Sequence, residues 1–193
     1  MPNPSIPDPV SPVARLSTFL LQADAVMAAW DRYDDEHTDL DGWPYDQDAY
    51  DTREAERDHA LWRAFQPLGE VAPSLLYLAE AAVDHLRATS LQARWPWQLS
   101  QLRDSLERVD AAEKEFAERT AASGTDYYAS GEETFLAFAA RNAAASAPVT
   151  EWLTHGRAVL EINAATVRAG QTGIRLAART PRAAAPAAPA RHR

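Results

Sequence analysis

Several segments of the chain each carry one histidine, and three of these histidines could bind a metal together. Glu56 and His59 are three residues apart, a spacing that places both side chains on one face of a helix. His85 and His155 fall on two further segments, each with a carboxylate nearby. If these segments converge, Glu56, His59, His85 and His155 form a ligand set for a single divalent transition metal such as zinc, nickel or iron. The simpler interpretation is a packing or surface role for each, because one histidine per helix is common by chance.

Other kinds of catalysis lack their residues. The chain contains no Cys, which excludes thiolate metal sites, disulfides and cysteine nucleophiles. It has neither a Gly-x-Ser-x-Gly elbow nor a Gly-x-Gly-x-x-Gly loop. A di-iron carboxylate bundle needs a second Glu-x-x-His motif, and none is present. We therefore expect a protein that is not an enzyme and has no cofactor, with a metal-dependent helical enzyme as the alternative.

The strongest local feature is an acidic segment, residues 31–58. It holds twelve carboxylates against three arginines, and its net charge of −9 equals that of the whole chain. Carboxylates at the C-terminal end of a helix interact unfavourably with the helix dipole, so those at the end of the first expected helix destabilise that helix slightly. The segment is either a solvated face that keeps the protein soluble or a docking surface for a cationic protein partner. The residues expected at such a surface are Asp31, Asp34, Asp35, Glu36, Asp39, Asp41, Trp43 and Tyr45.

The other end of the chain is basic. Residues 157–193 contain seven arginines and one carboxylate, a net charge of +6. Arg168, Arg175 and Arg179 recur at helical spacing and could meet the acidic segment, in the same chain or in a second copy. The overall charge disfavours a nucleic-acid partner, because phosphate contacts need a basic surface.

Apolar residues recur at three- and four-residue spacing over most of the chain, which predicts helices. No segment shows the sustained two-residue alternation of a strand. We expect the helices at about 13–38, 47–66, 71–93, 97–122, 131–146 and 149–178. Asp46 or Asp48 is expected to cap the second helix, residues 95–97 to separate the third from the fourth, and Pro148 to open the sixth. The expected fold class is an all-α, elongated antiparallel bundle of five to six helices.

The fourth expected helix carries a narrow apolar seam of the kind that pairs helices in coiled coils. Glu113 occupies one position in this seam, so the seam is not purely apolar. A homodimer through the seam is a further expectation. Its apolar members are Leu99, Leu102, Leu106, Val109 and Phe116.

Both ends of the chain differ in composition from the bundle. Residues 1–12 contain five prolines and are expected to form an extended arm, whereas residues 179–193 are almost entirely Pro, Ala and Arg and are expected to be disordered. The bundle domain then spans residues 13–178. The first residues lack the basic leader of a signal peptide, and no apolar run approaches the roughly 18 residues of a membrane span. These features favour a cytoplasmic interaction or assembly protein, and the abundance of Ala and Arg indicates a GC-rich bacterial genome.

Overall fold

The computed structural model describes residues 11–86, 92–122 and 129–170. Within these ranges the chain forms helices and no strand, which confirms the all-α fold class. The expected N-terminal arm and C-terminal tail lie mostly or wholly outside the described residues. The helices are α1 (Pro12–His37), α2 (Gln47–Gly69), α3 (Ala72–His85), α4 (Trp95–Ala122), α5 (Ala129–His155) and α6 (Arg157–Arg168).

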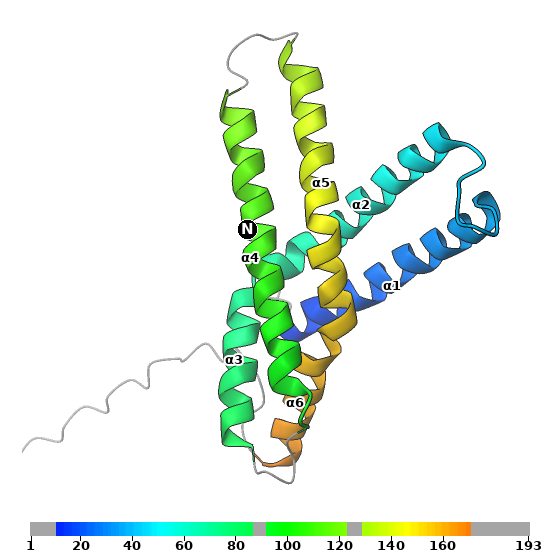
Figure 1. Ribbon diagram of the computed structural model, residues 1–193. Coiled ribbons are helices and arrows are strands. Elements are labelled where there is room, and N and C mark those ends of the chain that lie inside the picture. The colour runs from blue at the N-terminus through cyan, green and yellow to red at the C-terminus, as the bar shows by residue number, and fades with distance from the viewer. Residues whose placement is uncertain (1–10, 87–91, 123–128, 171–193) are drawn as a thin grey trace, which may run out of the picture.

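The helices form two antiparallel hairpins that diverge from a common base (Figure 1). One hairpin consists of α1 and α2, and the other of α4 and α5, with α2 packed against α5 where the hairpins cross. The shorter helices α3 and α6 pack together beside the beginning of α4. The far part of the first hairpin projects away from the other helices. It contains the acidic segment, residues 31–58, which we call the acidic arm.

The hydrophobic core lies where the two hairpins cross. Phe19, Phe65 and Trp152 come from α1, α2 and α5 and are buried there. The Phe65 ring lies 5.6 Å from Phe19, edge to face, and 6.1 Å from Trp152. The seam of α4 packs into the same core, since Leu102 and Val109 are buried. Most of the seam is therefore buried within the chain, and a homodimer through it stays a prediction.

Local sequence explains where three of the helices begin. Ser11 caps α1 by accepting a hydrogen bond from the Ala14 N–H at 3.2 Å, and Asp46 caps α2 by accepting one from Ala49 at 3.1 Å. Helix α4 begins at Trp95, two residues before its expected start. Pro96 is tolerated there because the first turn of a helix does not need its N–H.

The beginning of α4 is also tied to α6. The Trp95 indole N–H donates to the Glu161 carboxylate at 3.0 Å, and Arg94 pairs with the same carboxylate at 2.6 Å. The hydrogen bond from Trp95, together with Arg94, lowers the pKa of Glu161 despite its partial burial. Residues 95–97 therefore start a helix and anchor it, rather than only interrupting the chain.

The expected break at Pro148 is wrong. Helix α5 continues through Pro148, although a proline inside a helix removes one backbone hydrogen bond and costs about 3 kcal/mol. Pro148 is buried, and its carbonyl accepts a hydrogen bond from the Ser105 hydroxyl of α4 at 2.8 Å, so packing against α4 holds this turn of α5. The helix ends instead at His155. At the next residue, Gly156, a Cβ atom would collide with the Trp152 carbonyl and lie 3.2 Å from Leu16 of α1, so this position has no room for a side chain.

Several expected helix ends also move. Helix α2 continues past its expected end near residue 66 to Gly69, with Pro67 in its last turn. Helix α3 ends at His85 and α6 ends at Arg168, both earlier than expected. Residues 87–91 and 171–178, where the expected helices continue, lie outside the described residues. Among the helices that are described, none combines the length and apolarity needed to cross a membrane.

Candidate interaction surface

The loop that joins α1 to α2, residues 38–46, has a backbone fixed by its own hydrogen bonds. The Asp39 carboxylate accepts hydrogen bonds from the N–H groups of Asp41 and Trp43, at 2.9 and 2.8 Å. The Asp39 N–H in turn donates to the Trp43 carbonyl at 2.9 Å, so two hydrogen bonds join Asp39 and Trp43 across the loop. Gly42 has a φ of +80°, which glycine adopts without strain. These contacts give the loop one defined shape.

The same loop holds three large apolar side chains in solvent. Leu40 is fully exposed, and Trp43 and Tyr45 are 70% and 73% exposed. We call these three residues the arm tip. Exposing a single large apolar side chain is ordinary, but three within six residues of an ordered loop form a surface that could be buried by a partner.

The carboxylates around the arm tip divide into two groups. On α2, Glu56 pairs with Arg53, and Arg57 pairs with both Glu54 and Asp58. The second group is exposed and makes no ion pair with any described residue. On α1 and in the loop it includes Asp31, Asp35, Glu36 and Asp41, and on the first turns of α2 it includes Asp48 and Asp51.

The other aromatic residues of the arm pack α1 against α2. The Trp30 ring lies 5.1 Å from Tyr50 and 6.0 Å from Tyr33. The Arg57 guanidinium lies over Trp30, 4.3 Å from the ring centre. These residues are therefore structural, and only Trp43 and Tyr45 remain as aromatic contacts for a partner.

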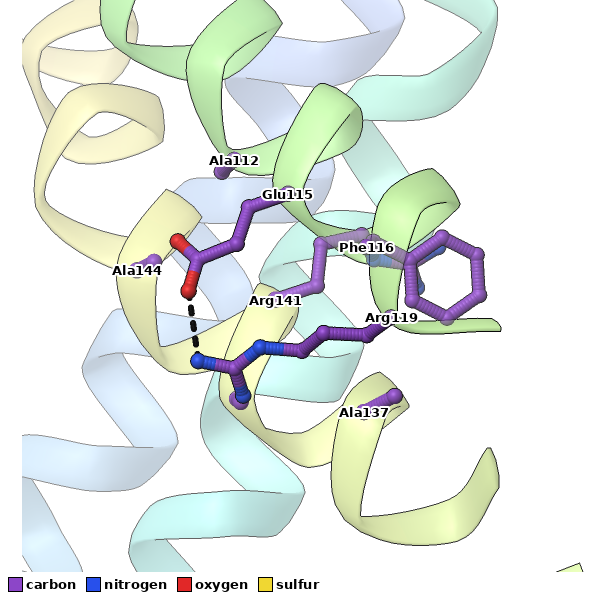
Figure 2. Close-up of a pocket in the computed structure, with 8 residues that line it drawn as sticks. Ala112, Glu115, Phe116, Arg119, Ala137, Arg141 and Ala144 are labelled. Carbon is purple, nitrogen blue, oxygen red and sulfur yellow. Dashed lines mark hydrogen bonds and ion pairs between the residues drawn. The ribbon is translucent and has the colours of Figure 1, made fainter. Parts of the chain in front are cut away.

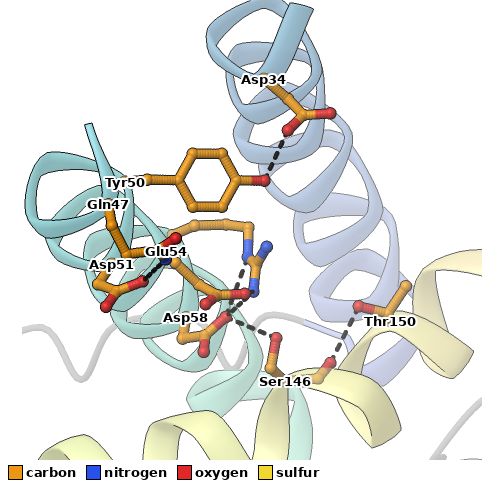
Figure 3. A network of polar contacts seen from close by, with 9 residues as sticks. Asp34, Gln47, Tyr50, Asp51, Glu54, Asp58, Ser146 and Thr150 are labelled. Atoms are coloured by element: carbon orange, nitrogen blue, oxygen red, sulfur yellow. Dashed lines mark hydrogen bonds and ion pairs between the residues drawn. The ribbon is translucent and has the colours of Figure 1, made fainter. Parts of the chain in front are cut away.

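Asp34 also has a structural role. Its carboxylate accepts a hydrogen bond from the Tyr50 hydroxyl at 2.6 Å, which joins α1 to α2 (Figure 3). This hydrogen bond is the main reason that the pKa of Tyr50 rises from 10.0 to about 12, because ionising the phenol would remove it. Asp34 was expected at the docking surface together with Asp35 and Glu36. The structure separates it from these two exposed neighbours, since it is half-buried inside the arm.

The raised pKa of Tyr50 predicts how the protein responds to alkali. The folded state favours the neutral phenol, so the stabilisation from this contact is complete below pH 10 and is lost as the pH rises towards 12. An ultraviolet titration of the folded protein should show one tyrosine ionising later than an ordinary phenol. Tyr50→Phe should remove that late step, and identical curves for the two proteins would contradict the assignment.

A polar network joins the base of the acidic arm to α5. Asp58 is 5% exposed, and its Oδ1 accepts hydrogen bonds from Arg57 Nη2 and from the Ser146 hydroxyl, each at 2.7 Å. Thr150 donates to the Ser146 carbonyl at 2.9 Å, which fixes the next turn of α5 (Figure 3). The network is the polar part of the junction that sets the direction of the arm.

The residues considered as metal ligands find other neighbours. His59 lies 3.3 Å from the Asn142 side chain, and His155 pairs with Glu151 at 3.3 Å and packs edge-on against Trp97. His85 lies at the exposed end of α3. No three His, Asp or Glu side chains of the described ranges are grouped as a metal site requires. The structure therefore does not bring Glu56, His59, His85 and His155 together.

Sequence reasoning missed a buried arginine on α5. Arg141 is 8% exposed, and its guanidinium lies over the rings of Trp62, Phe116 and Phe138 at 4.5, 4.7 and 5.1 Å. Burial lowers its pKa, an effect opposed by Glu113, whose carboxylate lies 3.5 Å away. The one available signal was Glu113 itself, a charge in an apolar seam.

Arg141 lies beside a small hollow between α4 and α5. Figure 2 shows Arg141 and Phe116 together at this hollow, with Ala112, Ala137 and Ala144 around it. Its volume is about 150 Å³. Sites for small molecules usually occupy roughly 300–1,000 Å³, so the hollow does not indicate a ligand site. Arg141 instead ties α5 to α4 and α2 where the hairpins separate.

Comparison with known proteins identifies no relative of the chain. No protein-family model, curated protein or solved structure matches it. Function is therefore inferred from the residues and the geometry described above.

Proposed function

We propose that the protein is a non-catalytic interaction protein that docks on a cationic protein partner through the end of its acidic arm. The observation that carries this proposal is the ordered loop that holds Leu40, Trp43 and Tyr45 in solvent. Tyrosine and tryptophan supply much of the binding energy of protein interfaces when they become buried. Because the loop is already ordered, its backbone loses little conformational entropy on binding.

The charge around the arm tip supports a basic partner. Asp31, Asp35, Glu36 and Asp41 are exposed and unpaired among the described residues, so their field is not neutralised locally. Carboxylates at the rim of an apolar contact speed association with a positive surface and repel negative ones. The arm tip would then provide most of the affinity, and the carboxylates would raise the association rate and select for basic partners.

A charge-reversal experiment tests the proposal. The 193-residue chain serves as bait in an extract of the native host, beside the double variant Asp35→Lys, Glu36→Lys. We expect the double variant to capture at least tenfold less partner than the parent protein, because the charge at the rim changes by four units. Asp34 is kept, since replacing it would also remove its hydrogen bond with Tyr50.

A matched control carries the same change of charge elsewhere. Glu107 and Asp110 are exposed on α4 and make no ion pair with described residues. Glu107→Lys, Asp110→Lys should therefore capture the partner as well as the parent protein does. Equal loss in both double variants would show a general effect of charge, and equal retention in both would show that the acidic rim is not a docking surface.

A further inference from the structure

We propose that residues 171–193 of the same chain bind along the acidic arm and compete with the cationic partner for it. This inference rests on the proposed function and names a regulator of the same surface. The segment lies beyond the described residues, and the proposal uses only its sequence and the place where the described chain ends. Three observations support it: charge, an ion pair that already links the two regions, and reach.

The charges of the two regions are complementary. Residues 171–193 contain no carboxylate side chain and five arginines, which are Arg175, Arg179, Arg182, Arg191 and Arg193. The acidic arm carries a net charge of −9. Its unpaired carboxylates gather towards the arm tip, on α1, in the loop and at Asp48 and Asp51 of α2, whereas those nearest to Arg57 are already paired. The end of the arm is therefore the part that a basic segment would neutralise.

The two regions already meet at the base of the arm. Arg157, the first residue of α6, pairs with Asp24 of α1 at 3.0 Å. Arg157 is also the first of the seven arginines in the basic end of the chain. The contact places the beginning of α6 beside α1, so the basic end begins next to the helix that leads to the arm tip.

The segment is long enough to reach the arm tip. At 1.5 Å per residue, Arg157 to Gly170 covers about 20 Å and Asp24 to Glu36 about 18 Å. Gly170 and Glu36 are therefore less than about 50 Å apart, even with the side chains of the ion pair included. An extended chain of 23 residues spans up to about 75 Å. Both the middle of the arm and its tip lie within this range.

Binding within one chain is favoured over binding between two copies. A tethered segment meets its own arm at an effective concentration in the millimolar range, far above a protein concentration of about 1 μM. If nine-tenths of the molecules hold the segment on the arm, the partner would bind about tenfold more weakly than to an open arm. Basic partners that bind weakly would then be excluded from the arm, whereas a partner that binds strongly would displace the segment.

Energy transfer between two labels tests this proposal without any partner. The chain has no Cys, so Ala28→Cys on exposed α1 and Ala190→Cys in the segment can carry a donor and an acceptor. We expect high transfer at about 50 mM salt that falls by at least half at about 1 M, where charges are screened within about 3 Å. Replacing the five arginines of the segment by Gln should lower the transfer to its value at about 1 M salt. Asp35→Asn, Glu36→Gln in the arm should lower it part of the way. The control Glu107→Gln, Asp110→Asn on α4 should leave it unchanged.

Two results would overturn the proposal. Equal transfer in the parent protein and in the five-Gln variant would show that the arginines do not hold the segment on the arm. Transfer that appears only when singly labelled chains are mixed would show that the occupant is a second copy. Failure here is distinct from failure of the proposed function, because capture of the partner is measured separately. If the acidic arm binds the partner but the segment does not bind the arm, Asp35→Lys, Glu36→Lys still captures less partner than the parent protein. The energy transfer between the two labels is then low in the parent protein as well.

Discussion

Replacing Trp152 with alanine is expected to lower the free energy of unfolding by about 3–5 kcal/mol, the usual cost of emptying a buried Trp or Phe site. Trp152 is fully buried where the two hairpins cross, and its ring lies against Phe65 of α2. The cavity would open between helices that also hold Arg141 and Asp58, so neighbouring side chains could fill it only by moving whole helices. This is the largest loss of stability that we expect from a single substitution.

Urea unfolding followed by circular dichroism measures this loss. Trp97→Ala is the matched control, because the same ring is more than half exposed there and should cost less than about 1 kcal/mol. Trp152→Phe should fall between the parent protein and Trp152→Ala, and it provides a folded sample if the alanine variant does not fold. A loss below about 1 kcal/mol for Trp152→Ala would mean that Trp152 does not fill the core between the two hairpins.

The second large effect is expected at the junction between the acidic arm and α5. Asp58→Ala removes the carboxylate that accepts hydrogen bonds from both Arg57 and Ser146. The charge of the partly buried Arg57 is then balanced by fewer carboxylates. Removing one partner of a buried ion pair typically costs about 3–5 kcal/mol. We expect a value near the lower limit, because Arg57 keeps its contacts with Glu54 and Trp30.

Asp58→Asn separates the hydrogen bonds from the charge. The amide oxygen can still accept from Ser146, so Asp58→Asn should lose clearly less stability than Asp58→Ala in the same urea experiment. Hydrogen exchange should show faster opening at the base of the arm in Asp58→Ala, with the α4–α5 hairpin little changed. If Asp58→Ala and the exposed control Asp48→Ala cost the same, the network does not hold the arm in place.

The periodicity of apolar residues was enough to predict the helices of the α1–α2 hairpin. The expected helices at 13–38 and 47–66 correspond to Pro12–His37 and Gln47–Gly69, and the cap at Asp46 was among the expected residues. These features are local, because spacing, caps and prolines act within one or two turns. The all-α class follows from them without knowledge of the packing.

The errors concern features that depend on packing. A proline usually begins or ends a helix, but α5 continues through Pro148, which packs against α4, and ends at His155 just before Gly156 meets α1. The seam of α4 predicted packing against another helix, and three of its residues are buried in the chain's own core. Local spacing contains no information about which helices meet, so these outcomes could not be read from the sequence.

The candidate surface was predicted in outline but not residue by residue. Asp34 was expected at this surface with its neighbours, whereas the structure places it inside the arm, where it accepts a hydrogen bond from Tyr50 beside Trp30 and Tyr33. Which aromatic residue packs and which is exposed depends on the pairing of α1 with α2. The charge pattern alone could not make that distinction, and Arg141 was missed for the same reason.

Photo-cross-linking from two equally exposed positions tests the central claim most directly. Trp43 at the arm tip and Tyr77 on α3 are 70% and 72% exposed, so a photoreactive aromatic residue is equally accessible at either position. In the native host, the account predicts a cross-linked product with a single basic protein from position 43 and none from position 77. Cross-linking of a partner from position 77 but not from position 43 would contradict the account, as would the absence of any product from position 43.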